Sequence, residues 1–171
     1  MESLSIATAQ FEHRSGDKPY NLAVIRHLAE RAAASGAKVI AFHECSVTGY
    51  TFARRLSREQ MLELAELIAE GESVQELIRI ARETGLTVLA GLFEKDAEDR
   101  LYKAYVCVNG DGLVARFRKL HPFINPHRPA SGRVAPSSRA ARKPATKQSP
   151  APVVSFTATS NAGHRYSSRC V

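Results

Sequence analysis

Hydrophobic and polar residues alternate at the start of the chain and then change to a helical spacing. Residues 4–11 alternate apolar and small polar side chains, which is typical of a strand buried on one face. Asp17 and Pro19 indicate a helix start, and apolar residues at helical spacing follow over residues 20–35 until Gly36. Residues 38–42 then form a short apolar run. The pattern predicts a strand, a helix and a second strand.

Two helix starts follow in the next part of the chain. Ser57 with Gln60, and Ser73 with Glu76, fit the capping box, in which two side chains satisfy free backbone N–H groups at a helix start. The first predicted helix carries apolar residues from 62 to 69, and the second carries them from 74 to 81 and stops at Gly85.

A strand and a hairpin complete the predicted elements. Residues 86–93 are strongly apolar, and residues 101–108 and 113–117 flank the turn sequence Asn-Gly-Asp-Gly. Asn and Gly tolerate the positive φ that a tight hairpin needs. The order of elements predicts an α/β fold with a mixed sheet and helices on one face. Because residues 86–91 are apolar on both sides, we expect a second sheet to cover the other face.

The charge is divided unevenly along the chain. The net charge is +7, yet residues 1–127 carry 16 basic and 17 acidic residues, and residues 128–171 carry 8 basic residues and no acid. We therefore expect two parts, a folded domain over residues 1–127 and a disordered basic tail over residues 128–171, in which only residues 153–159 could form a short strand. A solvated tail without a partner is favoured over a contact with nucleic acid or an acidic surface.

Other features of the sequence exclude several classes of protein. No apolar run approaches the length of a membrane span, and the N-terminus lacks the features of a signal peptide, so we expect a cytoplasmic protein without membrane contact. The three cysteines are widely spaced, which favours reduced thiols over disulfides or a zinc site. Phosphate-binding, zinc-protease and serine-hydrolase motifs are absent from the sequence.

Two charged residues remain as candidates for chemistry. Glu44 follows the strand of residues 38–42, at the end of the strand where open α/β sheets place their sites. Lys119 follows the second strand of the hairpin, and the two charges would support each other in a pocket. The residues alone favour the alternative that Glu44 is an ion-paired or capping glutamate and that Lys119 is solvated. Cys107 is expected to be a small core residue or half-buried, and Cys45 to point away from Glu44.

Several short motifs occur in a characteristic order, and together they resemble the carbon-nitrogen hydrolase (nitrilase) superfamily over residues 1 to about 127. They are Ala9-Gln10, Lys38-Val39-Ile40-Ala41-Phe42-His43-Glu44, Thr48-Gly49-Tyr50, Leu89-Ala90-Gly91, Tyr102-Lys103-Ala104-Tyr105 and Phe117-Arg118-Lys119-Leu120-His121. His43 departs from the family, which more often has Pro at that position.

The resemblance implies a nitrilase-like α-β-β-α sandwich, here incomplete, that hydrolyses small amides, nitriles or carbamoyl compounds. It implies a Glu-Lys-Cys triad without metal or cofactor, in which Glu44 matches the general base and Lys119 matches the lysine that stabilises the tetrahedral intermediate. The family's nucleophile follows the lysine in a small apolar strand, and this sequence has no such segment. Cys170 is the only cysteine after Lys119, and no apolar strand precedes it.

We therefore expect a truncated hydrolase that is inactive as it stands. A frameshift soon after His127 in a GC-rich gene would explain the Ala-, Arg- and Pro-rich tail. An apolar sheet face left uncovered would promote self-association. The alternative is a non-enzymatic α/β interaction module whose basic tail contacts an acidic partner.

Overall fold

The computed structural model describes residues 4–120 and the backbone of residues 153–159. Its elements, in chain order, are β1 (Leu4–Gln10), α1 (Lys18–Ala34), β2 (Val39–Phe42), the short 3-10 helix η1 (Thr51–Arg55), α2 (Arg58–Leu64), α3 (Glu72–Thr84), β3 (Thr87–Lys95), β4 (Leu101–Asn109), β5 (Gly112–Arg118) and β6 (Val153–Thr159). The predicted hairpin and the short strand at residues 153–159 are thus confirmed. The rest of the predicted disordered tail lies outside the described residues.

One mixed sheet organises the fold, with the strand order β5-β4-β3-β2-β1-β6. Strands β1, β2 and β3 are parallel, whereas β3–β4, β4–β5 and β1–β6 are antiparallel. The predicted α/β fold with a mixed sheet is therefore confirmed. The carboxyl ends of β2 and β3 lie at the same edge of the sheet because these two strands are parallel.

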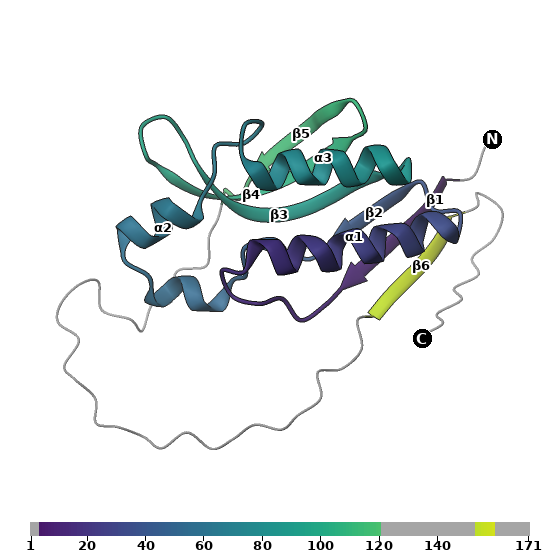
Figure 1. The fold of residues 1–171 in the computed structure, drawn as a ribbon, viewed down its shortest axis with the longest axis horizontal. Helices are drawn as coiled ribbons and strands as arrows, with labels where there is room; N and C mark the ends of the chain where they lie inside the picture. The colour runs from purple at the N-terminus through teal and green to yellow at the C-terminus, as the bar shows by residue number, and fades with distance from the viewer. Residues whose placement is uncertain (1–3, 121–152, 160–171) are drawn as a thin grey trace, which may run out of the picture.

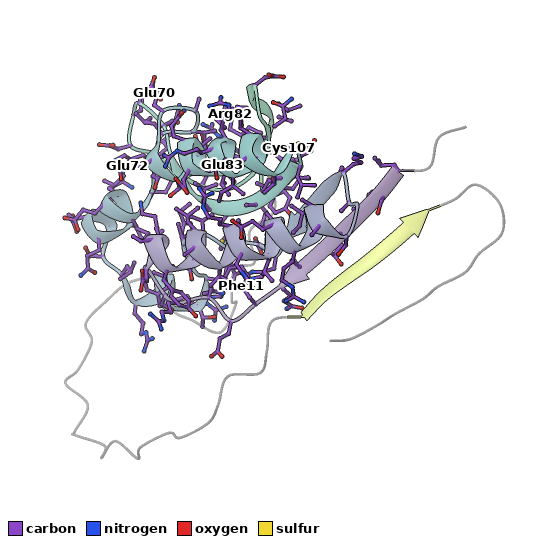
Figure 2. The ribbon with its side chains drawn as sticks, turned by 45° about the vertical axis from the view of Figure 1, so that its right-hand side comes forward. Phe11, Glu70, Glu72, Arg82, Glu83 and Cys107 are labelled. Atoms are coloured by element: carbon purple, nitrogen blue, oxygen red, sulfur yellow. The ribbon has the colours of Figure 1, made fainter. Side chains whose placement is uncertain are left out.

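Helices α1 and α3 lie side by side across one face of the sheet (Figure 1). The Asp17 side chain caps α1 by accepting a hydrogen bond from the Tyr20 backbone N–H, as the sequence predicted. Charged side chains of α3, including the labelled Glu72, Arg82 and Glu83, are exposed to solvent (Figure 2). The core lies between these helices and the sheet, and its fully buried members include Ile25, Leu28, Ile40, Leu77, Ile80, Val88, Leu92, Val106 and Val108.

Two predictions about the helices are wrong. The helix after Ser57 does have the predicted capping box, but it ends at Leu64, and Ala65 is extended with a ψ of 151°. Glu66 then forms an isolated parallel bridge with Glu94 of β3, so the apolar residues up to 69 belong to a loop that packs on the strand edge. The second wrong prediction is the capping box of Ser73 with Glu76. Helix α3 begins after Gly71, and the Ser73 hydroxyl instead donates to the Glu66 carboxylate at 2.6 Å.

The face of the sheet opposite α1 and α3 carries half-buried and exposed side chains. The strand pairing aligns Thr8, Ala41, Leu89, Cys107 and Ala115 in one row across five strands. The next row of this open face ends at Phe117, whose side chain is 59% exposed. The expected second sheet lies outside the described residues. Within the described part of the chain, no helix is long and apolar enough to span a membrane.

Candidate active site

The loop of residues 43–50 follows β2 and is held against β3. The Val47 N–H donates to the Gly91 carbonyl at 3.0 Å, and the Asn21 side chain of α1 donates to the Val47 carbonyl at 2.9 Å. A Cβ atom at Gly91 would lie only 2.4 Å from the Cys45 backbone nitrogen. Gly91 therefore provides the space that lets this loop cross the open face beside β3. The loop places Glu44 at the carboxyl edge of the parallel strands.

Glu44 and Lys119 form an ion pair at this edge, although 75 residues separate them in the sequence. The Lys119 Nζ donates to the Glu44 Oε1 at 2.9 Å, and both side chains are partly exposed. The backbone N–H of Lys119 donates to the Lys103 carbonyl at 2.9 Å, which extends the β4–β5 pairing beyond Arg118. The Glu44 carboxylate raises the pKa of Lys119 through its hydrogen bond and its charge, so the ammonium is favoured.

A second lysine lies beside this pair. The Lys103 Nζ donates to the Tyr50 hydroxyl at 2.9 Å and also lies 4.1 Å from the centroid of the Tyr50 ring. Tyr50 ends the loop that carries Glu44. Lys103 and Tyr50 both lie in the sequence motifs, but no pattern in the sequence assigns either of them a role. The feature that brings Lys103 close to Lys119 is the pairing of β4 with β5, in which the backbones of the two lysines lie next to each other.

Cys45 is fully buried and has a positive φ of 53°, which is unusual for a residue other than glycine. Burial, together with the neighbouring Glu44 charge, raises the pKa of the Cys45 thiol to about 11. Burial also raises the pKa of Cys107, which is half-buried on the open face as predicted. A neutral buried thiol is a poor nucleophile. Neither of the two described cysteines is therefore prepared for attack on a substrate.

His43 is enclosed by aromatic rings beside Glu44. Its ring lies 5.1 Å from the Phe11 ring and 5.4 Å from the His13 ring, centroid to centroid. Its Nδ1 donates to the Glu44 carbonyl at 3.1 Å, and its Nε2 is buried without a hydrogen-bond partner among the described atoms. Burial lowers the pKa of His13, and the charge of His43 lowers it further. His43 thus packs against the rings of Phe11 and His13 at the start of the loop.

A buried carboxylate supports the strand that precedes Lys119. Glu94 is 1% exposed, and its Oε1 accepts hydrogen bonds from Arg116 at 3.0 Å and from Arg118 at 2.5 Å. Both arginines belong to the last residues of β5. The ion pairs fix the end of this strand, and with it the backbone from which Lys119 extends. The sequence did not single out Glu94, because a glutamate at the end of an apolar run gives no sign of burial.

No group of three or more His, Cys, Asp or Glu side chains among the described residues could hold a metal ion. The arrangement instead offers a carboxylate that can exchange a proton and two ammonium groups that can stabilise negative charge. It is suited to acid–base and oxyanion chemistry on a small polar compound.

Comparison with known proteins gives consistent matches. The carbon-nitrogen hydrolase family model matches residues 5–161, beyond residue 127 where the resemblance in sequence was expected to end. A nitrilase from Pyrococcus abyssi is 38% identical over 107 residues, and an omega-amidase from Homo sapiens is 30% identical over 124 residues. The aligned parts cover 63% and 72% of this chain but only 38% and 42% of those relatives.

Solved structures of amidases share the fold. A crystal structure of an N-terminal amidase matches with a TM-score of 0.62 at 23% identity, over 71% of this chain and 29% of the other. An amidase from Nesterenkonia, in a structure that shows the result of Michael addition of acrylamide at the active site cysteine, matches with a TM-score of 0.57 at 21% identity. That match covers 71% of this chain and 46% of the amidase. Since the family model spans most of its length, this chain belongs to the carbon-nitrogen hydrolase family.

Proposed function

We propose that residues 4–120 carry two of the three catalytic groups of a hydrolase acting on non-peptide carbon–nitrogen bonds, with small amides, nitriles or carbamoyl compounds as substrates. Glu44 is the general base and Lys119 the cation that stabilises the tetrahedral intermediate. The observation that supports this proposal is the ion pair of Lys119 Nζ with Glu44 Oε1 at 2.9 Å, at the carboxyl edge of the parallel strands.

The proposed chemistry begins with a cysteine thiol whose proton is taken by the Glu44 carboxylate. The thiolate attacks the carbonyl carbon, and the negative charge that develops on the carbonyl oxygen is stabilised by the Lys119 ammonium. Glu44 returns the proton to the leaving nitrogen, so that an amide releases ammonia and leaves an acyl thioester. Water then hydrolyses the thioester, with Glu44 again accepting a proton.

The cysteine is the group that this chain does not supply in a recognisable form. Cys45 and Cys107 are buried thiols with raised pKa values, and Cys170, outside the described residues, follows no apolar strand in the sequence. The 171-residue chain on its own is therefore expected to be inactive, although Glu44 and Lys119 form an ion pair.

The experiment has two arms. In the first, the chain is assayed for ammonia release from a panel of amides, nitriles and carbamoyl compounds, and no turnover is expected. In the second, residues 4–120 are joined to the remaining part of the Pyrococcus abyssi nitrilase, which would supply the missing cysteine. The chimera should turn over substrate, and both Glu44→Gln and Lys119→Met should abolish that turnover.

The outcomes separate the parts of the proposal. Turnover by the unmodified chain that Glu44→Gln abolishes would show that one of its own cysteines is the nucleophile. A folded chimera whose turnover is unchanged by Glu44→Gln or Lys119→Met would refute the assigned roles. Lys38→Met serves as the matched control, because Lys38 is an exposed lysine that precedes β2, at the opposite end of that strand from Glu44.

A further inference from the structure

A pair of histidine rings joins the loop of residues 43–50 to the segment that follows β1. The His13 and His43 rings lie 5.4 Å apart, centroid to centroid, with an angle of 40° between their planes. Near the other end of the loop, a Cβ atom at Gly49 would lie 3.0 Å from the His13 Cδ2. His13 therefore contacts the loop both before and after Glu44 in the sequence.

The geometry at His43 suits an uncharged imidazole. Its Nδ1 lies 3.1 Å from the Glu44 carbonyl oxygen, which can only accept, so Nδ1 carries the proton of the neutral ring. Its Nε2 is buried without a hydrogen-bond partner among the described atoms. A proton added at Nε2 would create a buried N–H donor without an acceptor in this part of the structure. Protonation of the pair therefore favours arrangements in which the two rings separate and reach water.

The charges around the pair compensate a proton only in part. Burial lowers the pKa of His13 and the charge of His43 lowers it further, whereas the Glu12 carboxylate raises it. The Glu44 carboxylate is paired with Lys119, and β6, which pairs with β1, has no titratable side chain. Other titratable side chains on the described elements around the pair are Arg14 and Asp17, which form an ion pair at 3.8 Å, Cys45 and Tyr50 of the loop, and Arg54 and Arg55 of η1.

We propose that the His13–His43 pair is a pH-sensitive support for Glu44, which holds the start of the loop in place when both rings are uncharged and releases it when the pair is protonated. The proton comes from solvent and stays on an imidazole nitrogen, and the interaction lost is that of the Glu44 Oε1 with the Lys119 Nζ. This inference rests on the proposed function for its consequence alone, because Glu44 is then a base that leaves its position in acid. His43 is a positioning residue in this scheme.

NMR spectra of the full 171-residue chain, recorded from about pH 8 to about pH 5, test the support without substrate. The imidazole Cε1–H signals give the midpoint of each histidine, and the backbone amide signals of Glu44 and Lys119 report on their ion pair. We expect both amide signals to shift in a one-proton step at the midpoint of His13, and that midpoint should lie below the ordinary value of 6.5.

Three matched substitutions assign the step to the pair. His13→Gln should remove the step from the Glu44 and Lys119 signals. His43→Gln should raise the midpoint of His13, because the repulsion from His43 is lost, and should uncouple the two amide signals from it. His27→Gln removes an exposed histidine of α1 and should leave the step unchanged. The two substitutions within the pair act at different positions, so either folded variant decides the matter if the other does not fold.

The contrary results overturn the support. Glu44 and Lys119 signals that do not shift through the midpoint of His13 would show that the pair does not hold the loop. A step that persists in the folded His13→Gln or His43→Gln variant would arise from another group, and a step that His27→Gln also removes would not be local. The proposed function fails separately, since a chimera indifferent to Glu44→Gln would refute the catalytic role and leave the pH-dependent ion pair standing.

Discussion

Replacing Gly91 by alanine should displace the loop that carries Glu44. A Cβ atom at this position would lie 2.4 Å from the Cys45 nitrogen, 3.1 Å from the Glu44 carbonyl carbon and 3.2 Å from the Glu44 Cα. These are backbone atoms, so no side-chain rotation can relieve the contact. Gly91 is not among the residues with positive φ, and the requirement for glycine here is therefore one of space alone.

The expected loss of stability follows from the contacts that would have to change. The loop is joined to Gly91 by the Val47 N–H to the Gly91 carbonyl at 3.0 Å, and by the Gly91 N–H to the Ser46 Oγ at 3.3 Å. Losing both hydrogen bonds costs about 2 kcal/mol, and overpacking adds about 1–3 kcal/mol. The lower entropy of the unfolded alanine variant offsets about 0.4–1 kcal/mol. The free energy of unfolding should fall by about 2–5 kcal/mol.

Urea denaturation of Gly91→Ala beside Gly85→Ala measures this effect. Gly85 caps α3 with a φ of 69°, and a Cβ there would meet nothing within 4 Å, so its replacement costs only the left-handed conformation, about 1–2 kcal/mol. Gly91→Ala should also lower the pKa of Lys119 toward its ordinary value, because Glu44 moves away, whereas Gly85→Ala should not. The predicted displacement of the loop would be refuted if the free energy of unfolding of Gly91→Ala lay within about 0.5 kcal/mol of the parent value and the pKa of Lys119 were unchanged.

Four further perturbations test other parts of the structure. Ser57→Ala removes the capping box of α2 and should lower the free energy of unfolding by about 1 kcal/mol in urea titrations. Arg118→Met leaves the buried Glu94 carboxylate with fewer donors and should cost about 2 kcal/mol, a loss that Glu94→Gln in the same protein should reduce. Burial raises the pKa of the Cys45 thiol from 9.0 to about 11, so the buried neutral thiol contributes to the free energy of unfolding below pH 9, and this contribution is lost as the pH rises toward 11. In urea titrations at several pH values, Cys45→Ala should therefore show a smaller fall in the free energy of unfolding between pH 9 and 11. The open face is expected to promote self-association, and among the described residues Phe117 is its most exposed aromatic ring; Phe117→Ser should therefore lower the apparent mass measured by light scattering, and equal masses for both proteins would contradict that role.

The strands and the hairpin could be predicted from the sequence because their signals are local. Alternation of apolar residues and the Asn-Gly turn depend on neighbouring positions only, and the structure confirms both. The region after Leu64 could not be predicted in the same way. Its apolar residues have helical spacing, yet Glu66 pairs with the edge of β3 and its carboxylate accepts the Ser73 N–H at 2.9 Å at the start of α3. A distant partner, absent from any local pattern, decides the structure there.

The candidate site shows the same division between local and distant signals. Glu44 could be named from its position after a buried strand, and the parallel pairing of β2 with β3 does bring it to the carboxyl edge. The neighbouring Lys103 could not be recognised, because its contact with Tyr50 joins residues 53 positions apart. Sequence reasoning therefore named Glu44 and Lys119 and missed the second ammonium group beside them.

The pairing of Glu44 with Lys119 is supported by elements within residues 4–120. The loop after β2 is held by Gly91, the end of β5 is held by Glu94, and both supports lie on β3, which pairs with β2 on one side and with β4 on the other. Because β3 is the common support, contacts among the described residues already bring the carboxylate and the ammonium together. The nucleophile has no such support among the described residues. Under the proposed function, a cysteine brought to this edge by another segment would meet Glu44 and Lys119 as an existing ion pair, which is why the chimera is the decisive experiment on function.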